Sequence, residues 1–143
     1  MERIRSYTEA IRQATEQAMA RDQSVFLMGL GVDDVRGLLG TTRGLAQRFP
    51  RRVFDTPLSE DAMTGVAIGA ALAGMRPIHT HVRMDFLMLA MNQIVNIAAK
   101  MRYMHAGGVS VPLVIRTLIG DGWGAQHSQG LHSFFAHVPG LKV

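Results

Sequence analysis

The sequence predicts an α/β protein, a three-layer αβα fold around a mainly parallel sheet. Short apolar runs such as Ser24–Met28 and Val111–Ile115 alternate with amphipathic segments along the chain. Alternating strands and helices are typical of a parallel sheet with right-handed crossovers and helices on both faces. The sequence has no internal repeat, low-complexity tract or linker, and its 143 residues are enough for one sizeable core. We therefore expect a single domain over residues 1–143.

The first predicted elements are a capped helix and a buried strand. Ser6 and Glu9 have the spacing of a capping box, in which each side chain bonds a backbone N–H of the other residue. Apolar residues at three- and four-residue spacing follow, as in an amphipathic helix. Ser24–Met28 is a continuous apolar run, which predicts a strand buried on both faces. The polar, glycine-rich stretch Val32–Gly40 predicts a loop.

The stretch around Glu60 joins a predicted strand to a predicted helix. Val53–Phe54 is expected to be a buried strand, and Pro57 ends it by fixing φ and removing a donor. Ser59 is placed to cap a helix over Ala62–Leu72. Glu60 then lies at the carboxyl edge of the sheet, where open α/β folds bind ligands. The local pattern alone favours a structural carboxylate at a positive helix end over a ligand-binding acid.

The second half of the chain predicts two further strands and a long helix. Arg76–Val82 alternates and has its proline near the strand start, where a missing donor is tolerated. A helix is predicted from Asp85 to about Tyr103, and Val111–Ile115 is predicted to be another buried strand. Phe86, at the start of that helix, is either a core residue or a stacking platform. A short helix is expected over about 131–136.

Composition limits the classes of function. The chain is 48% apolar and has a net charge of +4, and its basic residues are scattered rather than gathered in a nucleic-acid-binding arm. It contains no cysteine, which excludes disulfides, thiolate zinc sites and cysteine nucleophiles. The sequence shows no signal peptide and no apolar run long enough to span a bilayer. We expect a cytoplasmic protein with neither nucleic acid nor membrane as a partner.

Histidines are the other candidate site residues. His127 follows the last predicted strand and lies on the same sheet edge as Glu60, so it is either a structural hydrogen-bonding group or part of a site. His79 and His81 share one strand face and could ligate a metal, but no third ligand has suitable spacing, so we predict no metal site. The glycine-rich loop at 120–124 does not match a phosphate-binding motif.

Five short segments of the sequence are more specific than these general patterns. They are Gly40–Leu45, Arg52–Glu60, Asn92–Lys100, Gln126–Gln129 and Ala136–Val143. Together they resemble the beta subunit of thiamine-diphosphate-dependent 2-oxo acid dehydrogenases, the decarboxylating components for pyruvate, branched-chain 2-oxo acids and acetoin. The resemblance covers essentially the whole chain. It implies the pyrimidine-binding domain of the transketolase-like, thiamine-diphosphate-binding fold, with the family's C-terminal domain absent.

The resemblance assigns roles to particular residues. It implies that Glu60 hydrogen-bonds the N1′ nitrogen of the cofactor's aminopyrimidine, which favours the tautomer that can take the thiazolium proton. It further implies that Leu58 and Phe86 bind the cofactor, with the Phe86 ring packed on the aminopyrimidine. His127 matches a histidine near the reacting carbon, suited to proton transfer or to guiding the lipoyl acceptor.

The resemblance also implies partners. The diphosphate and its magnesium would be held mainly by an alpha subunit, in an alpha2beta2-type assembly that is active only as a complex and passes its acyl group to a lipoyl-bearing acyltransferase. Such a protein is an oxidoreductase acting on the oxo group of its donor. Two alternatives remain open: a non-catalytic pyrimidine-domain binding or scaffold protein, and a split transketolase-type subunit.

The chain departs from the family pattern at several places. Where family members carry a Gly-Glu-Asp-Val-type acidic motif, the sequence is Gly29-Leu30-Gly31-Val32-Asp33-Asp34. The second site acid is thus absent or displaced, which leaves open whether Asp33 substitutes for it. His79-Thr80-His81 and Trp123 are also unusual near the expected pocket. These departures bear on the substrate more than on the cofactor.

Overall fold

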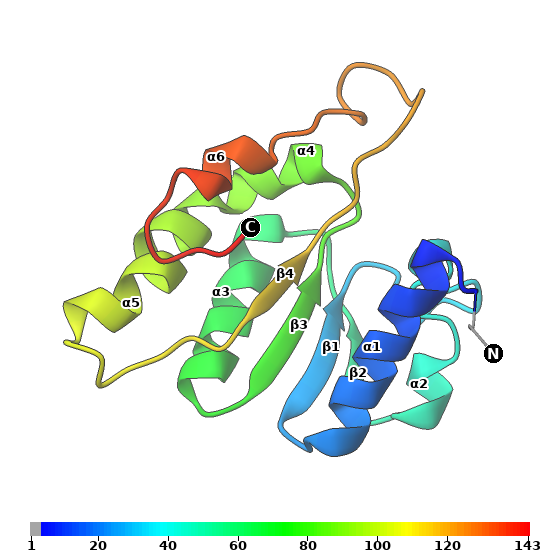
Figure 1. Cartoon of the computed structure of the whole chain (residues 1–143), viewed down its shortest axis with the longest axis horizontal. Helices are drawn as coiled ribbons and strands as arrows, with labels where there is room; N and C mark the ends of the chain where they lie inside the picture. Colours follow the sequence, from blue (N-terminus) through cyan, green and yellow to red (C-terminus); the bar gives the residue numbers. More distant parts are fainter. Residues whose placement is uncertain (1–3) are drawn as a thin grey trace.

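A four-stranded, all-parallel sheet organises the computed structural model, which describes residues 4–143 (Figure 1). Its strands are β1 (Val25–Gly29), β2 (Val53–Asp55), β3 (Arg76–Thr80) and β4 (Val114–Arg116), in the spatial order β2-β1-β3-β4. Helices lie on both faces of the sheet, so the predicted three-layer αβα architecture is confirmed. Because all the strands are parallel, their carboxyl ends meet at one edge.

The helices differ widely in length and regularity. They are α1 (Tyr7–Arg21), α2 (Leu45–Arg48), α3 (Glu60–Leu72), α4 (Met84–Leu87), α5 (Ala99–Met104) and α6 (His132–Ala136), with 3-10 turns at η1 (Leu38–Gly40) and η2 (Met88–Ala90) and a π-helical stretch at η3 (Asn92–Ala98). The start of α1 is as predicted, because the Glu9 backbone N–H donates to Ser6 Oγ at 3.2 Å. Within residues 4–143, no helix has the length and apolar character needed to cross a membrane.

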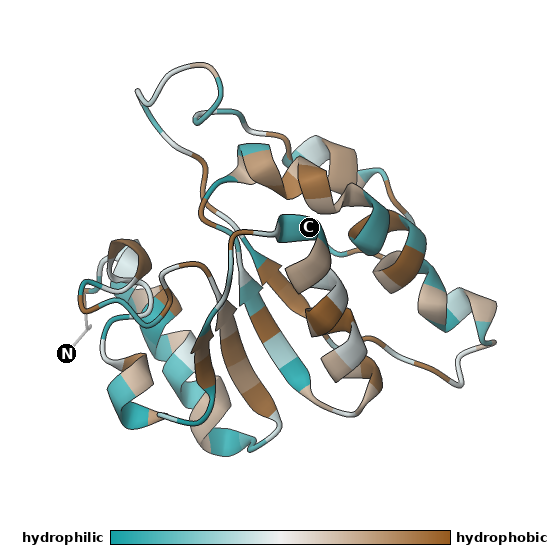
Figure 2. Cartoon of the chain, turned by 180° about the vertical axis from the view of Figure 1, so that it is seen from behind, coloured by the Kyte–Doolittle hydropathy of each residue, from teal (hydrophilic) through white to brown (hydrophobic). Residues whose placement is uncertain are grey.

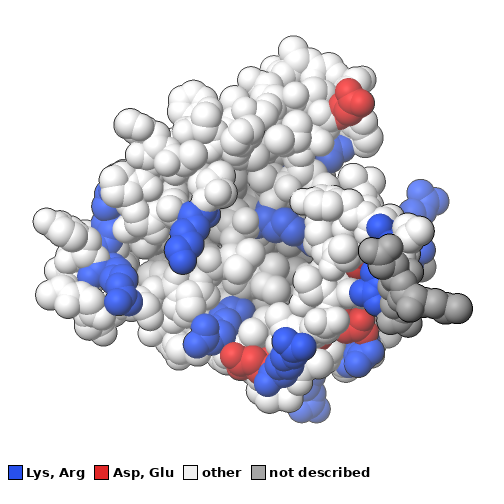
Figure 3. All heavy atoms as spheres, viewed as in Figure 1, with Lys and Arg blue, Asp and Glu red and all other residues white. Residues whose placement is uncertain are grey.

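Alternation along β1 divides the core between the two faces of the sheet. Val25 and Leu27 pack with residues of α1 and α2 on one face. Phe26 and Met28 pack against α3 on the other face. A further cluster joins α4, η2 and η3 to Phe135 of α6. Figure 2 shows apolar residues along the central strands and along much of α3, and Figure 3 shows basic side chains dispersed over one face rather than gathered in one patch.

Two expectations around β2 need correction. Val53 is buried, but Phe54 is 46% exposed, because β2 is an edge strand and only one of its faces is covered. The Phe54 ring still meets the Phe26 ring edge to face, with the centroids 5.8 Å apart. Ser59 does precede α3, but its side chain makes no capping hydrogen bond. Its backbone, with ψ near 82°, does not have the usual extended geometry of a capping residue.

The second half also departs from the expected boundaries. The segment predicted as one long helix is helical from Met84 to Met104, but it passes through α, 3-10 and π geometry rather than forming a uniform α-helix. The last strand begins at Val114 rather than Val111, after Pro112, which has no N–H to donate to a ladder. Gly65 of α3 faces the Gln93 side chain of η3, and a Cβ there would make only an ordinary van der Waals contact at 3.5 Å.

Candidate functional site

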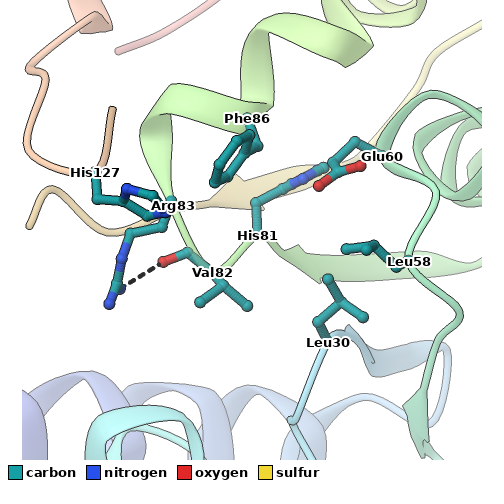
Figure 4. A pocket seen from close by; sticks show the side chains of 8 residues that line it. All are labelled: Leu30, Leu58, Glu60, His81, Val82, Arg83, Phe86 and His127. Carbon is teal, nitrogen blue, oxygen red and sulfur yellow. Dashed lines mark hydrogen bonds between the residues drawn. The ribbon is translucent and has the colours of Figure 1, made fainter. Parts of the chain in front are cut away.

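A pocket of about 310 Å³ opens at the carboxyl edge of the sheet (Figure 4). We call it the edge pocket, and its lining residues are Leu30, Leu58, Glu60, His81, Val82, Arg83, Phe86 and His127. Leu30 follows β1, Leu58 and Glu60 follow β2, and the remaining residues follow β3 and β4. All the site residues that the sequence predicted are therefore brought together. Leu30, Val82 and Arg83 were not predicted to be part of a site, and His81 was considered as a metal ligand and as an unusual residue near the pocket.

Glu60 is the first residue of α3 and is half-buried. It lies at the helix N-terminus, where the free backbone N–H groups carry partial positive charge. Within residues 4–143, no hydrogen-bond donor is bonded to this carboxylate. In Figure 4 the carboxylate faces the open interior of the edge pocket. Glu60 is therefore held by its backbone and free to bond a ligand through its side chain.

Phe86 and His127 form the opposite wall. Their ring centroids are 5.4 Å apart and the ring planes meet at 75°, an edge-to-face contact. Phe86 is 39% exposed, so it is a pocket residue rather than a core residue. Its ring offers a flat apolar surface to any planar group that enters beside Glu60.

The loop that carries His127 is fixed on both sides. Gln129 donates from its backbone N–H and from Nε2 to Asp85 Oδ1, at 3.3 and 2.8 Å. Burial raises the pKa of Asp85, but the hydrogen bonds from Gln129 and the charge of nearby His127 outweigh it and leave the pKa below its ordinary value. On the other side, Gly120 lies against the backbone carbonyl of His127, where any Cβ would overlap the oxygen.

His81 is a buried pocket residue whose hydrogen bonding identifies its tautomer. Thr64 has one hydroxyl hydrogen, which it donates to the backbone carbonyl of Glu60 at 2.7 Å. Its oxygen therefore accepts from His81 Nε2, which lies 3.3 Å away. This leaves His81 Nδ1 with its lone pair, available to a donor.

His79, in β3, and His81, just after β3, are both held in the neutral form. Burial, with a smaller contribution from neighbouring His79, lowers the pKa of His81 to about 3. Burial also lowers the pKa of His79. The two rings pack edge to face with their centroids 4.3 Å apart. Within residues 4–143, no cluster of three or more His, Cys, Asp or Glu side chains could hold a metal ion.

Two further lining residues bear on the family pattern. Leu30 lies at the edge pocket in the stretch where family members carry an acid, so this wall is apolar. Asp33 is exposed and is not among the residues that line the pocket. Composition could not reveal these roles. The available signal was the position of Leu30 directly after a buried strand.

Arg83 was also missed by the sequence analysis. It is 7% exposed and lines the edge pocket beside His127. Nη1 donates to the Val82 carbonyl at 3.0 Å, and the guanidinium carbon lies 4.1 Å from the centroid of the Trp123 ring. Its signal in the sequence was its place just after the strand that ends at Thr80.

Comparison with known proteins agrees with this geometry. The family "Transketolase, pyrimidine binding domain" matches residues 4–143. The chain is 46% identical over 138 residues to the pyruvate dehydrogenase E1 component subunit beta-2, mitochondrial, of Oryza sativa subsp. japonica, covering 94% of this chain and 37% of that protein. It is 46% identical over 155 aligned residues to the beta subunit of acetoin:2,6-dichlorophenolindophenol oxidoreductase of Cupriavidus necator, covering 100% of this chain and 46% of that protein.

A solved structure shares the fold. A split-gene transketolase, described as an inactive beta4 tetramer, matches with a TM-score of 0.54 and 16% identity, over 85% of this chain and 55% of that one. The chain spans less than half the length of these curated relatives. The match over residues 4–143 nonetheless places it plainly: the chain belongs to the transketolase pyrimidine-binding domain family, and its relatives include beta subunits of pyruvate and acetoin dehydrogenases.

Proposed function

We propose that this chain supplies the pyrimidine-binding half of the active site of a thiamine-diphosphate-dependent 2-oxo acid dehydrogenase, as its beta subunit. The observation that carries the proposal is the Glu60 carboxylate, which has no protein partner within residues 4–143 and faces an apolar pocket beside the Phe86 ring. The identity of 43 to 46% to pyruvate dehydrogenase and acetoin oxidoreductase beta subunits supports the same proposal.

The residues present fit an aminopyrimidine. Leu30, Leu58 and Phe86 give apolar walls, and Glu60 is a single carboxylate at the rim of the pocket. A planar ring with one basic nitrogen would stack on Phe86 and share a proton with Glu60. Thiamine diphosphate, when bound, supplies a carbon nucleophile and an electron sink for decarboxylation.

The chain's own residues then have separable tasks. Glu60 holds a proton at the pyrimidine nitrogen, and Leu58 and Phe86 orient the ring. His127, on the opposite wall, is placed to move a proton at the reacting end or to guide an acyl acceptor. His81 stays neutral and presents Nδ1 as an acceptor, so it adds polarity to the pocket without adding charge.

The proposal requires a partner. The edge pocket has no phosphate-binding loop and, in the described residues, no metal cluster. We propose that an alpha subunit holds the diphosphate and magnesium, in an alpha2beta2-type complex that transfers its acyl group to a lipoyl-bearing acyltransferase; the relatives' names, which describe them as beta subunits, support a partner subunit. Reconstitution with an alpha subunit, followed by a mass measurement in solution, tests the assembly directly.

The decisive experiment compares Glu60→Gln with wild type in that complex. The substitution keeps the shape of the side chain but removes its ability to exchange a proton, so kcat for 2-oxo acid decarboxylation should fall by about a hundredfold or more. Asp61→Asn is the matched control, because Asp61 is exposed, lies one residue along the same helix and does not line the edge pocket. It should stay close to wild type.

Cofactor affinity and thermal unfolding separate chemistry from folding. Both should change little in Glu60→Gln, since the carboxamide can still bond the ring. Full activity in this variant would refute the mechanism. If the wild-type complex binds no thiamine diphosphate at saturation, the chain is instead a non-catalytic pyrimidine-domain protein, and turnover of sugar phosphates would identify a transketolase-type subunit.

A further inference from the structure

A nearly buried cation without a counterion lies in the edge pocket. Arg83 is only 7% exposed and yet lines the pocket. Arginine is rarely buried to this extent unless it is paired, because desolvating the charge is costly. Within residues 4–143, the structure gives Arg83 no carboxylate partner.

The guanidinium is held in one orientation. Its Nη1 donates to the Val82 carbonyl at 3.0 Å, and its carbon Cζ lies over the Trp123 ring, 4.1 Å from the ring centroid. Trp123 in turn is fixed by its backbone N–H, which donates to Ser128 Oγ at 3.1 Å. A guanidinium fixed in this way can offer its remaining N–H groups to an anion without losing further side-chain freedom.

The nearby acids are engaged elsewhere or lie apart from Arg83. Asp85 Oδ1 accepts both bonds from Gln129, and Asp121 is exposed and forms no ion pair in the described residues. Glu60 belongs to the other side of the edge pocket, as Figure 4 shows, with Arg83 and His127 together on the far side. The pocket therefore has an acidic end and a cationic end.

We propose that Arg83 binds the carboxylate of the substrate, so that this site takes 2-oxo acids in preference to the neutral hydroxyketone acetoin. This inference rests on the proposed function, and it deepens it by choosing between the substrates of the two kinds of relative. A carboxylate beside Arg83 would supply the missing counterion and form charge-assisted hydrogen bonds. Acetoin has no charge to offer and would leave the guanidinium unpaired.

The role is one of binding rather than of chemistry. The negative charge moves away from the carboxylate as carbon dioxide departs, so Arg83 stabilises the bound ground state more than the transition state. Removing such an interaction raises KM and leaves kcat unchanged or higher. A residue that merely held the loop in place would instead affect every substrate alike.

The test uses the complex with the alpha subunit and a dye electron acceptor, with pyruvate and acetoin as substrates. Arg83→Gln should raise KM for pyruvate by about ten- to a hundredfold, the usual value of a charged hydrogen bond. Its kcat, and its KM for acetoin, should change by less than about threefold. Arg83→Lys keeps the charge and should recover part of the loss. Arg21→Gln, an exposed arginine on α1, is the matched control and should match wild type.

A second readout does not depend on turnover. Trp123 is the single tryptophan of the chain and lies against Arg83, so its emission reports on that group. Subtracting a Trp123→Phe complex removes the alpha-subunit signal. Pyruvate, but not acetoin, should change the Trp123 emission in wild type, and neither should do so in Arg83→Gln.

The outcomes separate the two proposals. Pyruvate turnover with an unchanged KM in Arg83→Gln overturns the inference and leaves the proposed function standing. An equal rise in KM for acetoin also overturns it, since the role would then be structural. If no substrate is turned over, the proposed function fails, and the presence or absence of a pyruvate-dependent change in Trp123 emission still decides the inference.

Discussion

The two sides of the molecule, one on each face of the sheet, differ in how much apolar side chain they leave exposed. On the face covered by α1 and α2, Met19 and Leu27 are fully buried and Leu45 is 1% exposed. On the other face, Met28 and Ala67 are also buried where α3 packs on the sheet, but Leu58 beside the edge pocket is 77% exposed and Val66 on α3 is 53% exposed. Closely packed cores resist any change of volume, whereas binding needs apolar surface that is still uncovered. We infer that the first face supplies stability and the second supplies the site.

The largest effect on stability should come from truncating a buried side chain on the face covered by α1 and α2. Leu27→Ala removes a fully buried side chain from the middle of β1 and should lower the free energy of unfolding by about 2 to 5 kcal/mol. Val66→Ala, on the exposed side of α3, should change it by less than about 0.5 kcal/mol. Urea unfolding followed by circular dichroism measures both. Equal losses in the two variants would show that the faces do not differ.

Lowering the pH should reduce the free energy of unfolding through His81, which lines the edge pocket. His81 is protonated in the unfolded chain below about pH 6.5, whereas its folded pKa is about 3. The unfolded state therefore binds more protons between these values, so stability is complete above pH 6.5 and falls as the pH falls. One such histidine costs about 2 kcal/mol between pH 7 and pH 5.

The matching variant is His81→Phe. It should flatten the loss of stability between pH 7 and pH 5, and His79 should account for part of the slope that remains, since its pKa is also lowered by burial. His105→Asn, at an exposed position after α5, should leave the slope as it is in wild type. An unaltered slope in His81→Phe would mean that this ring titrates normally in the folded protein.

The smallest change in stability should occur at the pocket wall itself. Phe86→Leu should alter the free energy of unfolding by less than about 0.5 kcal/mol, because the ring is 39% exposed. In the complex with the alpha subunit, however, it should weaken thiamine diphosphate binding by about three- to tenfold, the value of one aromatic stacking contact. Phe134→Leu, an exposed aromatic on α6 outside the pocket, is the control for both measurements.

Much of the fold could be predicted because local signals agreed with tertiary structure. The apolar run before Gly29 and the proline after β2 mark strand ends, and strand ends of a parallel sheet meet at one edge. That reasoning alone brought Glu60 and His127 together. The prediction that Phe54 is buried was wrong for a reason that lies outside the local sequence. Whether a strand lies at the edge of the sheet depends on the strand order, and the neighbouring residues do not encode that order.

The rest of the site depends on contacts between distant segments. Thr64 and His81 are far apart in sequence, and their hydrogen bond assigns the tautomer only after α3 has packed on β3. The stacking of Arg83 on Trp123 likewise depends on how the loop after β4 folds back. Residue type gave little warning, since an arginine after a strand is most often a solvated charge.

The contact between Gly120 and the His127 carbonyl has a practical consequence for engineering. The two ends of the loop 120–127 approach so closely at this contact that position 120 has no room for a side chain. The residues between the ends, including Trp123, are exposed. A designer who varies positions 121, 123 and 125, and keeps Gly122 and Gly124 with their positive φ angles, can reshape the cover over Arg83 and leave His127 where it is. Any library that varies position 120 will instead displace the histidine, so substrate preference and catalytic geometry can be tuned separately only if that glycine is kept.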